Sequence, residues 1–303
     1  MGWLREDVNR SRGTPRFYRG NGRNGIEVTE QPIWLERLPE PFHSFRVVQL
    51  SDIHHSLFTP LERVEQAVRL ANNLHPDLVS ITGDFISYSR SFIEPVAEAL
   101  GGLRATRGVF AVLGNHDYRV GADAVAQALR RRGIVVLRNQ NVALGSNGHS
   151  FHVVGVDDAT TGHDDLPRAL RGIPAYATKI LLSHHPGIIR RAARHDVDFV
   201  MAGHTHGGQV DWSVFATLYG WPKVQPRFFR GLDRLGPTQM YVSRGIGTIL
   251  LPIRIGCPAE IPRFCLLPRN GTGHGSGHSS RDADPRFDRG GREAEKNFRS
   301  FPH

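Results

Sequence analysis

The sequence predicts an α/β protein in which two mixed β-sheets pack face to face, with helices on the outside. Three observations support this prediction. Short apolar runs rich in β-branched residues alternate with segments whose apolar residues recur at helical spacing. A hairpin pattern in the middle of the chain adds antiparallel strands to the sheet. Polar clusters directly follow the apolar runs, and in open α/β sheets ligands bind beyond the carboxyl ends of the strands.

The first half of the chain supplies strands and helices in alternation. Residues 26–45 alternate apolar and polar side chains, which predicts opening strands and turns. The predicted strands that follow are Phe45–Leu50, Leu78–Thr82 and Val109–Leu113. The predicted helices are one over 61–74 behind Pro60, a short one over Pro95–Leu100 ended by Gly101, and one that Asp123 caps and Gly133 ends.

The second half begins with a short extended run, 134–137, and then turns back on itself. Two runs of period two, Asn141–Leu144 and Phe151–Val156, flank Asn147 and Gly148, a pair typical of tight hairpins. The later predicted elements are helices near 165–171 and 188–194, strands at Lys179–Leu182 and Asp198–Ala202, and a mostly β segment that ends in Arg263–Leu267.

The two ends of the chain differ in composition from the middle. Residues 1–24 are rich in Arg and Gly, and residues 269–303 combine Gly, Ser and charge with almost no apolar periodicity. We therefore expect a flexible N-terminal segment over 1–24, one folded domain over 25–268, and a disordered tail over 269–303.

Charge and cysteine content narrow the class of protein. The formal net charge is +9, and residues 42–268 hold 24 Lys and Arg against 18 Asp and Glu, which favours an anionic partner such as a phosphate ester, an anionic lipid surface or a nucleic acid. Cys257 and Cys265 form no CxxC pair, so we expect reduced thiols, although a single bridge is an alternative.

Targeting patterns are missing from the start of the sequence. The N-terminus lacks a long apolar run, and Glu6 stands where a myristoylation motif needs Ser or Thr. We expect a cytoplasmic protein, with peripheral contact to a membrane as a further option.

Five polar clusters carry the chemistry of the sequence, and each follows an apolar run. They are Asp52-Ile53-His54, Gly83-Asp84, Gly114-Asn115-His116-Asp117, His184-His185-Pro186 and Gly203-His204-Thr205-His206-Gly207-Gly208. Carboxylates, imidazoles and one amide in this number suffice to hold two metal ions rather than one. Asp52 and His54 would lie on one side of an extended segment, as would His204 and His206.

Each cluster also has a simpler interpretation when it is taken alone. Asp, Asn and Gly are common turn residues, and a single buried His is often satisfied by a backbone carbonyl group. The last cluster alone favours metal binding, because its two His and three flanking glycines permit close approach to an ion. The five clusters together outweigh their separate interpretations.

In this order, the clusters resemble the signature of the calcineurin-like metallophosphoesterases, DxH, GD, GNH(D/E), H and GHxH. The match spans Asp52 to His206, about half the chain. Residues 241–247 and 251–254 are similar to a bacterial branch of phosphodiesterases and UDP-2,3-diacylglucosamine hydrolases. Ala259 stands where this branch has a second proline. The resemblance implies a four-layer α/β/β/α metallophosphoesterase sandwich.

The resemblance also implies a role for each site residue. Asp52, His54 and His206 would bind one metal ion, Asn115, His184 and His204 a second, and Asp84 would bridge both. Such a pair of cations, manganese, iron or zinc, lowers the pKa of a bridging water, and the resulting hydroxide attacks phosphorus. His116 would act as the acid, with Asp117 either orienting it or capping the next loop.

Substrate contacts are less well defined by the sequence. His185 and Arg244 are candidates, although an ordinary salt bridge would equally explain Arg244. Aromatic residues interleaved with cations after the last cluster could hold a lipid tail or a base beside an anionic group, or could simply cover a sheet edge. They are Trp212, Phe215, Tyr219, Trp221, Phe228 and Phe229, with Lys223, Arg227 and Arg230.

The preferred function is hydrolysis of a phosphodiester or pyrophosphate. Alternatives are a phosphomonoesterase, a pyrophosphohydrolase for a lipid precursor such as UDP-diacylglucosamine, and a nucleic-acid-binding or scaffold protein on the same fold. Nucleic acid is disfavoured because no known binding motif occurs and Arg is not gathered into a stripe. A scaffold is disfavoured because all seven ligand positions are filled. The physiological substrate and the oligomeric state do not follow from the sequence.

Overall fold

The structure is a computed structural model that describes residues 25–146, 148–209, 227–249 and 252–269. The predictions made for the N-terminal segment, for most of the tail and for Trp212, Phe215, Tyr219, Trp221 and Lys223 fall outside the described residues.

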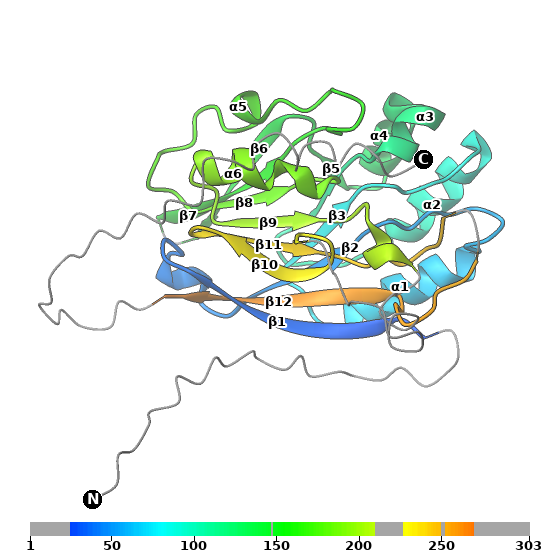
Figure 1. The fold of residues 1–303 in the computed structure, drawn as a ribbon, viewed down its shortest axis with the longest axis horizontal. Helices are drawn as coiled ribbons and strands as arrows, with labels where there is room; N and C mark the ends of the chain where they lie inside the picture. Colours follow the sequence, from blue (N-terminus) through cyan, green and yellow to red (C-terminus); the bar gives the residue numbers. More distant parts are fainter. Residues whose placement is uncertain (1–24, 147, 210–226, 250–251, 270–303) are drawn as a thin grey trace, which may run out of the picture. The chain divides into compact units, whose positions relative to one another are not determined.

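Two six-stranded mixed sheets form the centre of the domain (Figure 1). The first sheet has the order β1 (Glu27–Leu35), β12 (Glu260–Pro268), β2 (Phe45–Leu50), β3 (Leu78–Thr82), β4 (Val109–Val112) and β5 (Val135–Val136). The second has the order β10 (Gly231–Leu235), β11 (Thr238–Val242), β9 (Phe199–Ala202), β8 (Lys179–Leu182), β7 (His149–Gly155) and β6 (Gln140–Ser146). Strands β2 to β5 are parallel, as are β7, β8, β9 and β11.

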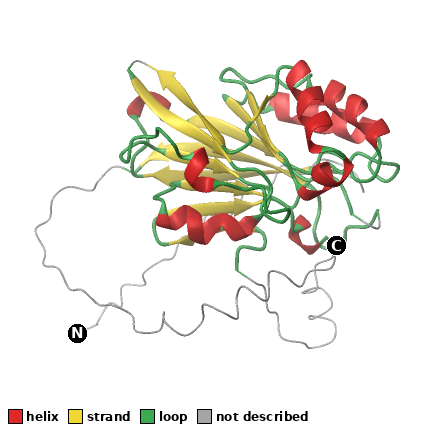
Figure 2. Ribbon diagram, turned by 90° about the horizontal axis from the view of Figure 1, so that it is seen from above, coloured by secondary structure: helices red, strands yellow, loops and turns green. Residues whose placement is uncertain are grey.

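Helices cover the outer face of each sheet, and the strands lie between two groups of helices in Figure 2. The helices are α1 (Leu61–Asn73), α2 (Ile93–Leu100), α3 (Asn115–Val120), α4 (Ala122–Arg131), α5 (Leu166–Ala169) and α6 (Ile189–Arg194). Apolar residues of α1, α2 and α4 pack on the first sheet, and those of α5 and α6 pack on the second. This arrangement confirms the predicted four layers.

The core between the two sheets explains why the strands read as apolar runs. Val47 and Phe110 from the first sheet meet Val153, Leu182 and Phe199 from the second, all at most 3% exposed. Strands buried on both faces need apolar side chains at every position, which hides the period of two. Helix α1 shows the helical spacing instead, because it buries only one face.

The predicted hairpin is confirmed, whereas some boundaries differ. Ser146 pairs with His149 across the turn, and Gly148 has a φ of 77°, which suits glycine. Asp123 does not cap α4: Gly121, at a φ of 139°, precedes the helix, and Asp123 lies in its first turn. The segment before Phe45 forms one strand, β1, and a short 3₁₀ turn at Glu40–Phe42.

Candidate metal centre

All seven predicted ligands lie at the carboxyl ends of five parallel strands. Asp52 and His54 follow β2, Asp84 follows β3, Asn115 follows β4, His184 follows β8, and His204 and His206 follow β9. All of them are buried except His204, which is half-buried. The two packed sheets therefore bring together, at one edge, residues that are up to 154 positions apart in the sequence.

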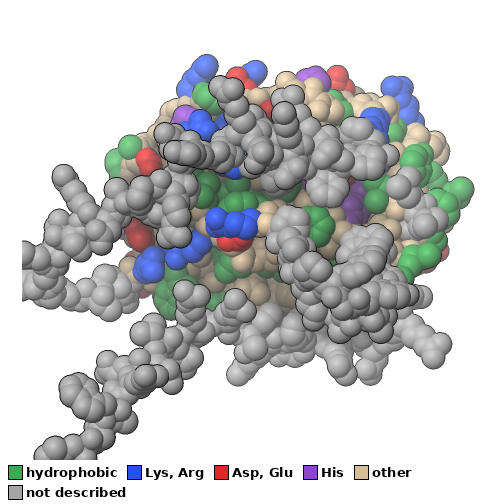
Figure 3. Space-filling view, viewed as in Figure 1, with side chains coloured by type: hydrophobic (Ala, Val, Ile, Leu, Met, Phe, Trp, Pro, Cys, Tyr) green, Lys and Arg blue, Asp and Glu red, His purple; other side chains and the backbone are tan. Residues whose placement is uncertain are grey.

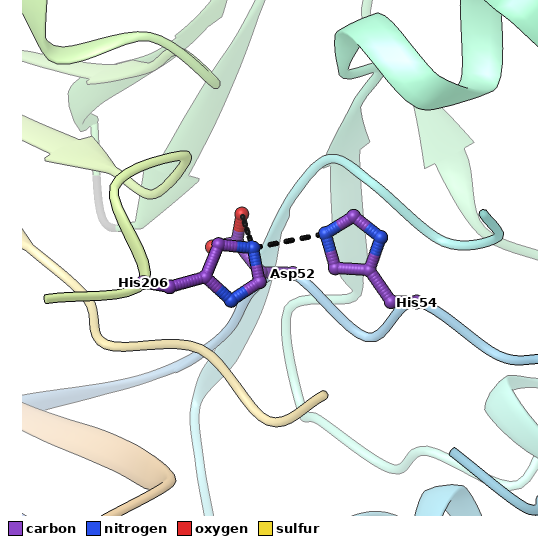
Figure 4. Close-up of side chains that lie close together, drawn as sticks. All are labelled: Asp52, His54 and His206. Atoms are coloured by element: carbon purple, nitrogen blue, oxygen red, sulfur yellow. Dashed lines mark hydrogen bonds and ion pairs between the residues drawn. The ribbon is translucent and has the colours of Figure 1, made fainter. Parts of the chain in front are cut away.

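A first group of ligand atoms consists of Asp52, His54 and His206 (Figure 4). The Nε2 atoms of His54 and His206 are 3.0 Å apart, and Asp52 Oδ1 is 3.6 Å from His206 Nε2. Three atoms with lone pairs thus converge on one point. This convergence suits a cation better than it suits a set of hydrogen bonds.

A second group consists of Asn115, His184 and His204. His184 Nε2 lies 3.1 Å from Asn115 Oδ1 and 3.2 Å from His204 Nδ1. The side chain of His204 thus lies beside His184 and that of His206 beside His54. The assignment of the two histidines to different metal ions stays a prediction.

Asp84 lies between the two groups. Its Oδ2 is 3.4 Å from His54 Nε2 and 3.2 Å from His184 Nε2. One carboxylate oxygen is thus shared by the two sets of ligand atoms.

The backbone at this edge is not extended, contrary to the expectation for Asp52–His54 and His204–His206. Five of the seven ligand residues have φ in the left-handed region, with values of 49° to 73°: Asp52, His54, Asp84, His204 and His206. Such conformations are uncommon outside glycine and cluster at functional sites. The chain turns sharply after β2, β3 and β9, and period-two alternation therefore does not apply there.

Neighbouring glycines make room for these turns. A Cβ atom on Gly114 would lie 2.2 Å from Asp84 Oδ1, and one on Gly203 would lie 2.4 Å from Asp52 Oδ2. The glycines in the clusters are needed because other chain segments approach so closely.

Hydrogen bonds behind the ligands fix the histidine rings. His54 Nδ1 lies 3.0 Å from Ser87 Oγ, and His184 Nδ1 donates to the carbonyl oxygen of Thr82 at 2.8 Å. His184 Nε2 therefore keeps its lone pair for a cation when the ring is neutral. Ser87 and Thr82 were not singled out in the sequence, where an isolated Ser or Thr near a strand end has no distinguishing pattern.

Asp117 supports the Asp84 turn rather than the His116 ring. Its carboxylate accepts backbone N–H groups from Asp84, Phe85 and Gly114, each at 2.9 Å. Because Gly114 precedes α3, Asp117 also caps the start of that helix, whereas the sequence had suggested that it orients His116 or caps the next loop. The GNHD cluster was expected to be a turn, but α3 begins at its Asn115.

His116 lies beside both groups. Its backbone N–H donates to Asp84 Oδ1 at 2.9 Å, its Nδ1 is 3.3 Å from the carbonyl oxygen of Ser87, and its ring meets that of His54 edge to face. It also has a ring nitrogen close to ligand atoms of His54 and Asp84. The predicted acid is therefore at the edge of the site.

Electrostatics keep most of the imidazoles neutral. Burial lowers the pKa of His54 to about 3 and holds the pKa of His204 and His206 well below the ordinary value. Burial likewise lowers the pKa of His184, but the Asp84 carboxylate outweighs this effect and raises the pKa to about 10. Burial raises the pKa of the Asp84 carboxyl group, but the charge and the hydrogen bond of His184 outweigh this effect and hold the pKa of Asp84 well below the ordinary value.

The donor set fits divalent metal ions. Neutral imidazoles, carboxylates and one amide oxygen, without a thiolate, suit manganese, iron or zinc. Cys257 is buried nearby, but its thiol donates to the carbonyl oxygen of His206 and is not a member of either group. The thiols of Cys257 and Cys265 are free, as expected.

The two predicted substrate contacts have partners within the protein. His185 Nδ1 accepts the backbone N–H of Gly187 at 3.0 Å, and its ring centre is 4.7 Å from that of His204. Arg244 forms ion pairs with Glu27 and Glu260 at 3.0 and 2.8 Å. A substrate contact for either residue stays a prediction.

Comparisons with known proteins agree with this geometry. A family model described as calcineurin-like phosphoesterase matches residues 45–208. The chain is 31% identical over 250 residues to the uncharacterized metallophosphoesterase YkuE of Bacillus subtilis (strain 168), covering 81% of this chain and 87% of that protein. It is 29% identical over 227 residues to the phosphodiesterase YaeI of Escherichia coli (strain K12), covering 74% and 82%.

A third relative is larger than this chain. The chain is 34% identical over 257 residues to the transmembrane protein with metallophosphoesterase domain of Bos taurus, which covers 79% of this chain but only 56% of that protein. Among the described residues, no helix has the length and apolar character that a membrane crossing requires.

Proposed function

The chain belongs to the calcineurin-like phosphoesterase family, and we propose that it hydrolyses a phosphodiester or pyrophosphate bond at a centre holding two divalent metal ions. The name of its Escherichia coli relative, a phosphodiesterase, favours the diester. The observation that carries the two-metal proposal is the place of Asp84 Oδ2, within 3.4 Å of a ligand nitrogen in each group.

Two bound cations would lower the pKa of a water molecule and neutralise charge on the phosphoryl oxygens. The remaining steps belong to side chains of the protein. Asp52, His54 and His206 would hold one cation, Asn115, His184 and His204 would hold the other, and Asp84 would contribute to both. Asp117 keeps the Asp84 turn in place through three backbone N–H groups.

His116 is proposed as the general acid. Its Nδ1 faces the carbonyl oxygen of Ser87, which accepts a hydrogen bond but cannot donate one, so Nδ1 carries a hydrogen. The proton for the leaving oxygen would therefore come from Nε2 of the protonated ring. Proton transfer of this kind contributes about 10²- to 10⁴-fold to the rate.

An amphiphilic ester is a second candidate substrate. The Tyr88 side chain is 57% exposed, and its ring centre lies 6.4 Å from that of His116, while Leu57 and Phe58, just after the first cluster, are 88% and 49% exposed. Apolar groups at the edge of the site would suit a lipid-linked phosphate and peripheral contact with a membrane. On the face drawn in Figure 3, the visible Lys and Arg side chains lie in separate groups.

A substrate panel with manganese-loaded protein tests the proposal. The substrates are bis-p-nitrophenyl phosphate, p-nitrophenyl phosphate, cyclic nucleotides and UDP-diacylglucosamine. Asp84→Asn should lose most of its hydrolysis and bind fewer metal ions, whereas His116→Ala should keep its metal ions and lose activity. Asp123→Asn, which changes an exposed carboxylate of α4, is the matched control.

The outcomes separate the alternatives. Full activity in Asp84→Asn would refute the two-metal centre. A preference for the monoester would refute the diesterase assignment, and a preference for UDP-diacylglucosamine would favour the lipid-linked substrate. No hydrolysis of any ester by metal-loaded protein would favour the scaffold.

A further inference from the structure

Arg254 lies at the centre of a segment that lines the first group of ligands. Its guanidinium donates to three backbone carbonyl oxygens: Nε to Gly247 at 3.1 Å, Nη2 to Arg244 at 2.8 Å, and Nη1 to Cys257 at 3.3 Å. The planar fork of five donors on an Arg side chain makes such a three-way contact possible, and a Lys ammonium does not reproduce its geometry. Arg254 thus ties together three points of the segment 244–257, of which residues 244–249 and 252–257 are described.

Two of these three points touch the metal ligands directly. The backbone N–H of Gly247 donates to the carbonyl oxygen of Asp52 at 2.8 Å. The thiol of Cys257 donates to the carbonyl oxygen of His206 at 3.3 Å. Arg254 is therefore one residue removed from two of the three ligands in the first group.

The packing of the segment against Asp52 is equally close. A Cβ atom on Gly247 would lie 2.1 Å from the carbonyl oxygen of Ile53, and one on Gly245 would lie 2.6 Å from Asp52 Cβ. Since Asp52 has a φ of 49°, its turn needs support of this kind to persist. Small shifts of the segment must therefore move the Asp52 carboxylate.

The second group is supported by other residues. Among the hydrogen bonds of the described residues, none joins the segment 244–257 to Asn115 or His184. His184 is held by Thr82, and Asn115 begins α3, which Asp117 caps. The two groups are also linked to each other: the backbone N–H of His204 donates to Asp52 Oδ1 at 2.9 Å, Asp84 Oδ2 lies near a nitrogen of each group, and ligand atoms of Asp52, Asp84 and His184 lie within 4.8 Å of one another.

We propose that Arg254 is a positioning residue that, through the segment 244–257, holds Asp52 and His206 in place and so sets the metal affinity of the first group but not of the second. This inference rests on the proposed two-metal function. It concerns a residue outside the five clusters and outside the matched family region, which ends at residue 208.

The charge of Arg254 works against the same cation. It lies near enough to His54 and His206 to add to the effect of burial in lowering the pKa of both rings. A positive charge there must also repel a metal ion. Losing the hydrogen bonds of Arg254 should weaken metal binding by the first group, whereas losing its charge should strengthen it. Arg254→Lys, which keeps the charge, and Arg254→Gln, which removes it, separate the two effects.

The experiment measures manganese binding by equilibrium dialysis of the full chain, with the ion content read by elemental analysis. His54→Ala first identifies which of the two dissociation constants belongs to the first group. Arg254→Lys keeps the charge but loses the fork, and should weaken that constant about 10- to 100-fold, the range for residues that support metal ligands. The other constant should stay as in the wild type.

Two further variants complete the design. Gly247→Ala should displace the turn at Asp52 through a steric clash from the same segment, and it changes no charge. It should weaken manganese binding by the first group. Arg37→Lys is the matched control. Arg37 also donates to a carbonyl oxygen, that of Ala175, and to the carboxylate of Asp198. Asp198 precedes β9 and so lies at the end of that strand opposite to the metal ligands. Arg37→Lys should leave both constants unchanged.

Several results would overturn the inference. Unchanged binding in Arg254→Lys with tighter binding in Arg254→Gln would mean that only charge matters. Equal weakening of both constants, in either Arg254→Lys or Gly247→Ala, would mean general destabilisation. If Arg254→Lys does not fold, Gly247→Ala decides alone. A wild-type protein that takes up no manganese would instead refute the proposed function.

Discussion

Replacing Gly203 with alanine should disturb the first group of ligands through a single methyl group. The added Cβ would lie 2.0 Å from Ser51 Oγ, and ordinary contact begins at 3.4 Å, so the two atoms must separate by about 1.4 Å. Ser51 cannot move freely, because it is fully buried, donates to Asp52 Oδ2 at 2.6 Å and accepts from Thr82 Oγ1 at 2.6 Å.

The expected cost follows from these contacts. Overpacking a buried site costs about 1–3 kcal/mol, and losing a hydrogen bond to a charged group costs about 1.5–3 kcal/mol. We therefore expect Gly203→Ala to lower the free energy of unfolding by about 3 kcal/mol or more, and to weaken metal binding by Asp52. Gly203 is not in the left-handed region, so alanine adds no strain in φ.

Urea unfolding of the metal-free protein, followed by circular dichroism, gives the free energy. The matched control is Gly145→Ala in β6, where the nearest atom to the new Cβ is 3.8 Å away. That variant should stay within about 0.5 kcal/mol of the wild type. If Gly203→Ala matches this control in both unfolding and manganese binding, the close packing of Gly203 against Ser51 does not position Asp52, and the reasoning fails.

Two other predictions concern the Asp84 turn and the protons of the site. Asp117→Asn should lower the free energy of unfolding, measured with urea, by about 2 kcal/mol. The two oxygens of Asp117 accept three backbone N–H groups, whereas the NH₂ group of an Asn side chain cannot accept any. An unchanged free energy of unfolding would contradict the role of these hydrogen bonds. His184, with a pKa raised to about 10 in the metal-free site, should lose its proton when manganese binds. The apparent affinity for manganese should therefore rise with pH up to about 10. Calorimetry in buffers of different ionisation enthalpy should show that about one proton is released as manganese binds, and a binding enthalpy that does not depend on the buffer would contradict this prediction.

The fold could be predicted because its determinants are local. Alternation of apolar strands with helical spacing marks the parallel part, and Asn147-Gly148 marks the hairpin at β6 and β7. The start of α4 was misplaced because Asp123 is a good capping residue by type, whereas the chain enters α4 directly from α3 through Gly121. Tertiary connections of this kind leave no mark on residue preference.

The ligand set could be predicted from the order of the clusters, but its geometry could not. Period-two alternation failed at Asp52 and His206 because both residues turn into the left-handed region. The role of Asp117 was left open because the three N–H groups it accepts come from two segments, 84–85 and 114. Arg254 belongs to a stretch that resembles the bacterial branch, but its role could not be predicted because its contacts are with backbone oxygens, which no side-chain pattern reveals.

The left-handed turns explain why the site needs so much support from outside the clusters. A non-glycine residue in that region costs about 1 kcal/mol or more, and five ligand residues adopt it. Local hydrogen bonds offset part of this cost: the N–H of Asp52 donates to the carbonyl oxygen of Gly83, and that of His54 to the carbonyl oxygen of Asp84. The remainder must come from Asp117 on one side and the segment 244–257 on the other. On the proposal made above, such a site is shaped before a metal ion binds, so the affinity of each group should depend on the residues that hold its turns as well as on the ligands themselves.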